Sequence, residues 1–297
     1  MLLKNRVPIL YVLRGIRWEI PIVMAISVTF HFIKVYFGSI IPELSISIPA
    51  FLGTAISVIL SFKLNQSYDR WWEARKIWGG IVNDSRTFVI QMQMFLSKGN
   101  ESSIKRIAKR QIAWCYCLGQ SLRGLDPLAN LEKFLSEKDV KDISVHSNKP
   151  LAILQINSLD LADLKSNGQM ELFSLVQINQ TLVNFSNAMG MAERIKNTIF
   201  PTTYRVFLHM FIYVFVITLS ISLAEMRPFF EIPLLLVISC SFFLLEKSAT
   251  HLQDPFSNKP TDTPVTAIAR TIEINIQSLI KEENISKPIV VDGYFQM

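Results

Sequence analysis

The sequence predicts an all-α membrane protein with four transmembrane helices and further amphipathic helices outside the bilayer. Of its 297 residues 50% are hydrophobic and only 18% are charged, and the mean hydropathy of +0.31 exceeds that of most soluble domains. The apolar residues are concentrated in a few long runs, which is typical of a chain that crosses a membrane several times. Basic cytoplasmic loops explain the net charge of +6. Because no stretch interleaves basic and aromatic residues, no nucleic-acid partner is expected.

The N-terminal part of the chain is predicted to begin in the cytoplasm. Residues 1–19 mix basic and apolar residues without a signal-peptide core, so we expect an amphipathic segment on the cytoplasmic membrane surface. The first span is expected at 20–37, with Lys34 near enough to its end to extend to the aqueous interface. The next loop has no Lys or Arg, whereas Arg70 and Arg75 follow the second span. The positive-inside rule therefore places the N-terminus and the region after Phe62 in the cytoplasm, and four spans place the C-terminus there as well.

The second span is expected at 49–71, in a helix that continues into the cytosol. Two stripes at i, i+4 spacing run along it, about 100° apart. The first stripe allows close approach of helix backbones in lipid and consists of Gly53, Ser57 and Ser61. The second would face a shared axis if copies packed through the first, and it consists of Thr54, Val58 and Phe62. Such a ring would be a hydrophobic channel gate, although on these residues alone an ordinary packing face is the simpler interpretation.

The remaining segments follow from charge and periodicity. Residues 72–200 are expected to form a cytosolic helical domain, because charges recur regularly and apolar residues follow helical spacing. The third span is expected at 203–224, which contains a long uncharged run. The fourth is expected at 229–246; its uncharged run is short, but the turn before it leaves no other route back across the membrane. Residues 247–297 are expected to form a cytosolic C-terminal segment with one amphipathic helix at 265–280.

Residues that carry chemistry are scattered rather than clustered. The four histidines lack ligand spacing, and His31 and His209, which fall in spans, are expected to be neutral and bonded to backbone carbonyls. Carboxylates at span ends are expected to be solvated or salt-bridged, as Glu73 would be with Lys76 at i, i+3. The others of this kind are Glu19, Asp69, Glu225, Glu231 and Glu246. Free, buried thiols are expected at Cys115, Cys117 and Cys240. No catalytic residue and no metal site is expected, and nothing in the sequence supports an enzyme.

Three segments carry a resemblance to a known family. They read SFKLNQSYDRWWEARKIWG at 61–79, ERIKNTIFP at 193–201 and HLQDPFSNKPTDTP at 251–264. In this order, and over essentially the whole chain, they resemble the bacterial branch of the bestrophin family. The resemblance implies a homopentameric ion channel of the bacterial inner membrane. Each subunit would supply four membrane helices and part of a helical cytosolic vestibule around one central pore.

The resemblance also implies where the pore is narrow. The family's neck is three residues of the second membrane helix, spaced i, i+4, i+8, and it ends eight residues before the Arg of an Arg-Trp-Trp motif. Counting back from Arg70 gives Phe62, Val58 and Thr54, the stripe already found from periodicity. A second constriction, the cytosolic aperture, is placed at Phe173 or Leu172.

The sequence departs from the family in two places. Thr54 occupies the outermost neck position, where bulky apolar residues are usual, so the upper neck should hydrate more readily. Calcium-activated animal members carry an acidic run after an Asn/Asp-Pro-Phe motif, but residues 257–262 contain a single acid. Calcium needs several oxygen ligands, so no calcium clasp and no other cofactor is expected.

The expected partners are monovalent ions, further copies of the chain and the lipid bilayer. The family includes members that conduct anions and members that conduct cations. The resemblance therefore does not decide whether the conducted ion is chloride or Na⁺ or K⁺. One alternative is a membrane-bound enzyme, which needs a buried cluster of acids or histidines that the sequence does not predict. The other is a non-conducting scaffold whose cytosolic helices bind a partner.

Overall fold

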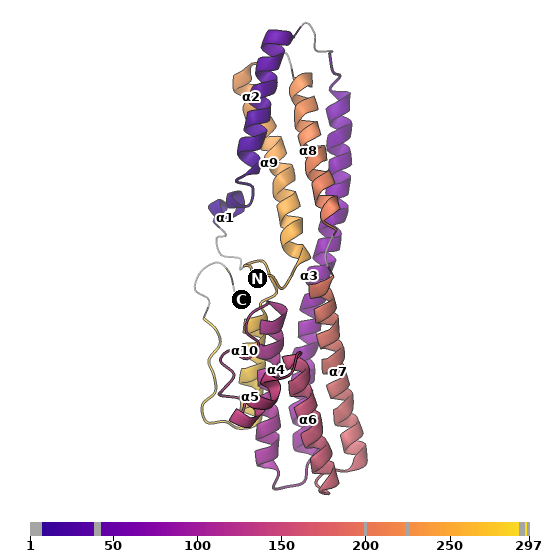
Figure 1. Ribbon diagram of the computed structural model, residues 1–297, viewed down its shortest axis with the longest axis vertical. Helices are drawn as coiled ribbons and strands as arrows, with labels where there is room; N and C mark the ends of the chain where they lie inside the picture. Colours follow the sequence, from indigo (N-terminus) through magenta and orange to yellow (C-terminus); the bar gives the residue numbers. More distant parts are fainter. Residues whose placement is uncertain (1–7, 39–42, 199–200, 224–225, 291–294, 296–297) are drawn as a thin grey trace. The chain divides into compact units, whose positions relative to one another are not determined.

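The computed structural model is helical throughout its regular elements (Figure 1). It describes residues 8–38, 43–198, 201–223, 226–290 and 295. The helices in these ranges are α1 Ile9–Arg14, α2 Glu19–Phe37, α3 Ser47–Phe95, α4 Glu101–Leu122, α5 Glu137–Ser144, α6 Lys149–Ser166, α7 Leu172–Asn197, α8 Thr202–Ser222, α9 Pro228–Gln253 and α10 Val265–Leu279.

The chain divides into two compact units. The first, here called the membrane unit, comprises Lys4–Arg70 and Ile199–Gln253. The second, here called the bundle unit, comprises Trp71–Thr198 and Asp254–Met297. The membrane unit therefore combines α1, α2, α8 and α9 with the first part of α3. The rest of α3 belongs to the bundle unit, because the helix runs without a break through the predicted end of the second span.

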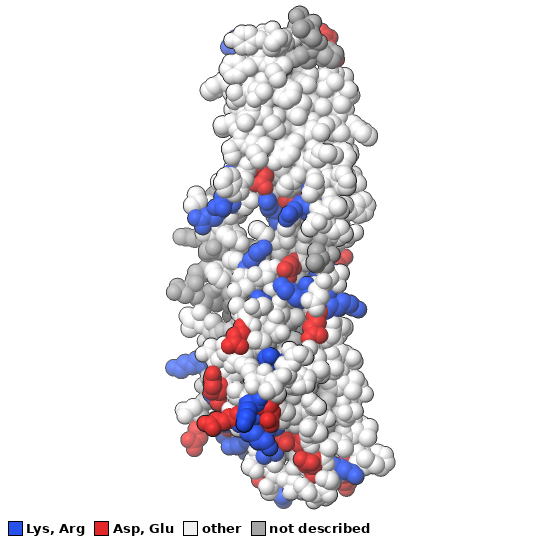
Figure 2. Space-filling model, viewed as in Figure 1, with Lys and Arg blue, Asp and Glu red and all other residues white. Residues whose placement is uncertain are grey.

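The membrane unit contains the four predicted spans. Helices α2, α3, α8 and α9 are each long and apolar enough to cross a membrane, so the expected fold class is confirmed. Their visible surface carries a broad band almost free of Lys, Arg, Asp and Glu (Figure 2). Inside the unit, apolar side chains from α2, α3, α8 and α9 form one cluster that includes Val23, Ile56, Leu60, Ile212, Phe215, Leu235 and Phe243.

Helix α9 is longer than its uncharged run suggested. It extends from Pro228 to Gln253 and includes Glu231 and Glu246, which bound the uncharged run in the sequence. Both carboxylates are completely buried. A charge that is paired inside the protein does not end an apolar helix. The length of the uncharged run therefore underestimated the length of α9.

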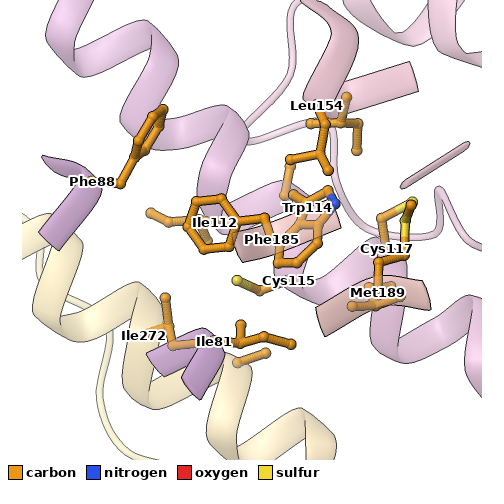
Figure 3. Packing of buried hydrophobic residues seen from close by; sticks show 14 of the residues in the cluster. Ile81, Phe88, Ile112, Trp114, Cys115, Cys117, Leu154, Phe185, Met189 and Ile272 are labelled. Carbon is orange, nitrogen blue, oxygen red and sulfur yellow. The ribbon is translucent and has the colours of Figure 1, made fainter. Parts of the chain in front are cut away.

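The bundle unit is built around the second part of α3. The apolar positions that follow helical spacing there, from Ile77 to Met92, are buried as expected. Phe88 meets Phe185 of α7 edge to face, and Phe185 also lies against Trp114 of α4 (Figure 3). Aromatic pairs of this kind add to the free energy of burial. The same core holds the thiols of Cys115 and Cys117.

The cysteines of the bundle unit are unreactive, buried thiols. Cys115 and Cys117 are free and buried, as predicted, and burial raises the pKa of both thiols to about 12. Because the thiolate is the reactive form, neither is suited to nucleophilic or redox chemistry. Cys240 is also free but only half-buried, so the expectation of a buried thiol is wrong there.

Candidate functional site

The predicted neck residues lie together on one exposed side of α3. Thr54 is exposed, and Val58 and Phe62 are 51% and 63% exposed. Ile56 and Leu60, which pack against the chain's own helices, are almost fully buried. Two residues along a helix correspond to a rotation of about 200°, so the neck stripe points away from the helices of its own chain. The structure thus brings the three residues onto one surface that is available to something outside the subunit.

The hydroxyl of Thr54 already has an internal partner. Its Oγ1 donates to the carbonyl of Ala50 at 2.9 Å, one turn earlier in α3. The oxygen keeps lone pairs that can accept from water, but the proton is not free to solvate an ion. Thr54 therefore offers acceptor character on the neck stripe.

The small-residue stripe is divided between two surroundings. Ser57 and Ser61 are exposed, and Ser57 donates to the carbonyl of Gly53 at 2.8 Å. A Cβ built on Gly53 would lie 3.2 Å from Cε2 of Phe215 in α8. Gly53 thus permits close packing within the subunit, a contact that was not predicted. Its expected place between copies, with Ser57 and Ser61, stays a prediction.

On its buried side, α3 is held by polar contacts as well as by apolar packing. Lys63 directly follows Phe62 but is only 1% exposed, and its Nζ lies 2.6 Å from Oε1 of Glu246 in α9. The hydroxyl of Tyr204 in α8 donates to the carbonyl of Ile59 at 3.1 Å. Further along, Nε of Arg70 donates to the carbonyl of Gln253 at 2.8 Å. These contacts attach the part of α3 between residues 59 and 70 to α8 and α9.

Glu246 gathers a cluster that the sequence did not predict. Besides Lys63, it accepts a hydrogen bond from Oγ1 of Thr250 at 2.8 Å. Its second oxygen, Oε2, lies 3.3 Å from Nε2 of His209 in α8. The expectation that His209 bonds a backbone carbonyl is therefore wrong. We call these four residues the Glu246 cluster.

A second cluster with the same chemistry lies at the other end of the spans. Lys34 of α2 donates to Glu231 of α9 and, at 2.7 Å, to the carbonyl of Ser220 in α8. Ser220 donates to Glu231 at 2.8 Å, and Nδ1 of His31 lies 3.5 Å from the other carboxylate oxygen. The expectation that Lys34 extends to the interface is wrong, because Glu231 and Ser220 satisfy it inside the protein. We call these four residues the Glu231 cluster.

These clusters correct the expectation that the residues that carry chemistry are scattered, whereas the salt bridges expected of Glu231 and Glu246 are confirmed. Each carboxylate is balanced by one lysine, and both carboxylates are completely buried. The residues of each cluster come from helices far apart in the sequence. The only local signal was that Lys63 shares the helical spacing of buried Ile56 and Leu60 on α3. Among the span-end carboxylates, Glu19 pairs with Lys247 at 2.9 Å and Glu73 with Lys76 at 2.6 Å, as the salt-bridged interpretation predicted. Glu225 lies outside the described residues.

The two candidate aperture residues stand at the start of α7 in the bundle unit. Leu172 is the first residue of the helix and is 59% exposed, and Phe173 is 82% exposed. Large apolar side chains at this exposure are available for contact with another copy or with a narrow ion path. Neither has a described contact that fixes its role, so the aperture stays a prediction.

In the loop that would hold a calcium clasp, the acidic side chains accept hydrogen bonds from backbone N–H groups of the same loop. Asp262 is almost completely buried, accepts from the backbone N–H of Lys259 at 3.1 Å, and has a pKa raised by that burial. Asp254 accepts from the backbone N–H of Phe256 at 3.3 Å. Within the described ranges, no three His, Cys, Asp or Glu side chains gather in a group that could hold a metal ion.

Comparison with known proteins places this arrangement in a family. A family model described as Bacterial/Fungal Bestrophin protein matches residues 9–278. The voltage-dependent anion channel-forming protein YneE of Escherichia coli K12 is 31% identical over 250 residues, which cover 83% of this chain and 80% of that protein. The voltage-dependent anion channel-forming protein RSc3414 of Ralstonia nicotianae is 25% identical over 265 residues, covering 89% and 87%. A crystal structure of a bacterial bestrophin homologue from Klebsiella pneumoniae matches with a TM-score of 0.84 and 25% identity, over 91% of this chain and 100% of that chain. The chain therefore belongs to the bacterial and fungal bestrophin family.

Proposed function

We propose that this protein is an ion channel whose pore is lined by α3 from several copies of the chain, with its neck at Thr54, Val58 and Phe62. The observation that carries the proposal is the exposed apolar stripe on α3, opposite the side that packs within the subunit. Membership in the bestrophin family and the names of the relatives support a channel rather than an enzyme. Five copies around one axis is the assembly that we propose.

The neck closes the pore by excluding water. A ring of Val58 and Phe62 side chains presents apolar surface on all sides, and a narrow apolar constriction empties of water without any blocking charge. Opening then requires only that these side chains turn or move outward from the axis. Thr54 leaves the outer end of the neck easier to wet, because its oxygen accepts hydrogen bonds.

We further propose that the permeant ion is a monovalent anion. The relatives are named as anion channel-forming proteins. The positive edge of the Phe62 ring can face an anion, and the net charge of +6 favours anions near the protein. No calcium ion or other cofactor is needed in this proposal, since the loop at 257–262 has its acid engaged in its own backbone hydrogen bonds.

The proposed setting is the bacterial inner membrane, with both termini in the cytoplasm. The bundle unit would then surround the cytosolic part of the ion path, and Leu172 or Phe173 would narrow it. Ser57 and Ser61 would face the neighbouring copy of α3, because their small side chains let backbones approach closely.

The test is electrical recording of the purified protein in planar bilayers under a salt gradient. Phe62→Ala and Val58→Ala should raise conductance or open probability, and a reversal potential near that of chloride is expected. Matched controls are Phe207→Ala in α8 and Val237→Ala in α9, whose side chains are similarly exposed but lie off α3. If all four variants behave alike, the neck assignment is wrong.

Native mass spectrometry of the same preparation tests the assembly. Five subunits are expected. A monomer or dimer would contradict the channel and favour a non-conducting scaffold, because one or two copies of α3 cannot enclose an axial path.

A further inference from the structure

In the Glu246 cluster, one carboxylate oxygen accepts two hydrogen bonds and the other accepts none from the described residues. Oε1 accepts from Nζ of Lys63 at 2.6 Å and from Oγ1 of Thr250 at 2.8 Å. Oε2 faces Nε2 of His209 at 3.3 Å. Both of these facing atoms are buried, and neither makes a hydrogen bond within the part of the chain that the structure describes. A buried polar atom without a partner is costly, so this geometry is suited to a second positive charge on the histidine.

From this arrangement we propose that His209 and Glu246 form a proton-binding latch on the pore-lining helix. Proton uptake by His209 turns the 3.3 Å contact into a charge-assisted hydrogen bond to Oε2. Glu246 then bridges Lys63 of α3 on one oxygen and His209 of α8 on the other. The three helices are tied together one residue beyond the neck residue Phe62.

Three helices contribute charged groups around His209, and the histidine is the group in the cluster that we propose takes up a proton. Lys63 comes from α3. Glu246 and Lys247 come from α9. Glu19 of α2 is paired with Lys247 at 2.9 Å, so these two charges largely compensate each other. The ring of Phe243 packs edge to face against the imidazole of His209, with 5.4 Å between the ring centroids. Histidine is the side chain whose charge ordinarily changes between about pH 5 and 8, and a carboxylate oxygen of Glu246 lies 3.3 Å from Nε2 of His209.

The sign of the effect follows from linkage. If the proton binds more tightly to the latched arrangement than to one in which α3 has moved, acid favours the latched state. The latched state is the one in which the neck stripe holds its described position, so acid should reduce conduction. A difference of about one pH unit in proton affinity between the two states shifts their ratio by up to about tenfold.

The Glu231 cluster supplies a matched control. It has the same composition of lysine, histidine, carboxylate and hydroxyl, but it lies at the opposite end of the spans and includes no residue of α3. His31→Gln therefore removes a histidine of equivalent chemistry without touching the latch. His209→Gln keeps a side chain that can donate to Oε2 but cannot take up a proton.

The first measurement does not depend on conduction. Thermal unfolding of the purified protein is followed in detergent at about pH 8 and about pH 5.5, on either side of the histidine range. The wild type should gain stability at the acidic pH relative to His209→Gln, and His31→Gln shows how much of the response comes from the Glu231 cluster. An equal response of His209→Gln and the wild type would overturn the latch, whatever the protein conducts.

The second measurement rests on the proposed channel and tests its coupling to the latch. Bilayer currents are recorded while the pH is changed on one side at a time. Acid on the side nearer His209 should lower the open probability by up to about tenfold in the wild type and in His31→Gln, and should leave His209→Gln unchanged. Currents without pH dependence would overturn the coupling. Absence of current altogether, with the thermal result intact, would count against the channel but not against the proton site.

Discussion

The ion pair between Lys63 and Glu246 allows the attachment of α3 to α9 to be measured directly. Lys63→Met keeps the length and apolar stem of the side chain but removes its ammonium group. Glu246 is then left completely buried, with Thr250 and His209 as its remaining partners. Breaking a buried ion pair by removing one partner costs about 3–5 kcal/mol. Because Thr250 still donates at 2.8 Å, we expect the lower end of that range, about 3 kcal/mol.

A double variant distinguishes loss of the pair from loss of packing. In Lys63→Met with Glu246→Gln, no charge is left without a partner, and replacement of a buried pair by neutral groups is often close to neutral. We expect the double variant to recover most of the loss and to lie within about 1 kcal/mol of the wild type.

The assay is unfolding by SDS in mixed micelles at fixed protein concentration, since subunit association affects apparent stability. Additive losses in the two single variants, with no recovery in the double variant, would refute a direct interaction. A loss below about 1 kcal/mol in Lys63→Met would show that the ammonium is solvated rather than buried.

Two predictions concern the bundle unit. A Cβ on Gly119 would lie 2.4 Å from Cγ1 of Val265, so Gly119→Ala should separate α4 from α10 and destabilise the unit by about 1–3 kcal/mol in thermal or denaturant unfolding. Gly190→Ala in α7, where nothing lies within 4 Å, is the matched control and should be neutral or stabilising by up to about 1 kcal/mol. The second prediction is a loss of stability in acid that comes from Asp139. Burial raises the pKa of this carboxyl, but its hydrogen bond and ion pair with Arg110 lower the pKa by more, so that it lies below the usual 3.8. Stability from this pair should be complete above pH 3.8, fall as the pH drops through the folded-state pKa, and be absent from Asp139→Asn across an acid titration.

The sequence predicted the parts of the fold that are encoded locally. An apolar run long enough to cross a bilayer identifies a span regardless of what surrounds it, which is why α2 was found close to its observed bounds despite Lys34, and α8 likewise. Helical spacing on α3 likewise grouped Val58 and Phe62 on one stripe, and the structure shows both side chains exposed. Such patterns need only the period of the helix and the difference between apolar and polar side chains.

The polar clusters could not be predicted in the same way. Lys63 and Glu246 are 183 positions apart, and each by itself resembles an ordinary charge at the end of a span. Lys34 was expected to reach water because an isolated lysine in lipid would do so. Its actual environment depends on Glu231 and Ser220, which only the packing of α2 against α8 and α9 brings close. The contact of Gly53 with Phe215 was missed for the same reason.

The distribution of the contacts along α3 bears on how the proposed neck could open. Between Ile59 and Arg70, three described polar contacts attach the helix to α8 and α9, at Ile59, Lys63 and Arg70. Before Ile59, the described contacts of α3 with the other helices of its unit are apolar.

Rotation of the whole helix would break all three polar attachments in every subunit. By contrast, a bend that begins before Ile59 separates only apolar surfaces, which lipid tails can cover at little cost. Thr54 and Val58 lie in the part that can bend, whereas Phe62 lies beside the Lys63 attachment. Movement of Phe62 therefore requires release of Lys63, while movement of Val58 does not. Opening of the lower neck should accordingly depend on the Glu246 cluster, and opening of the upper neck on apolar packing alone.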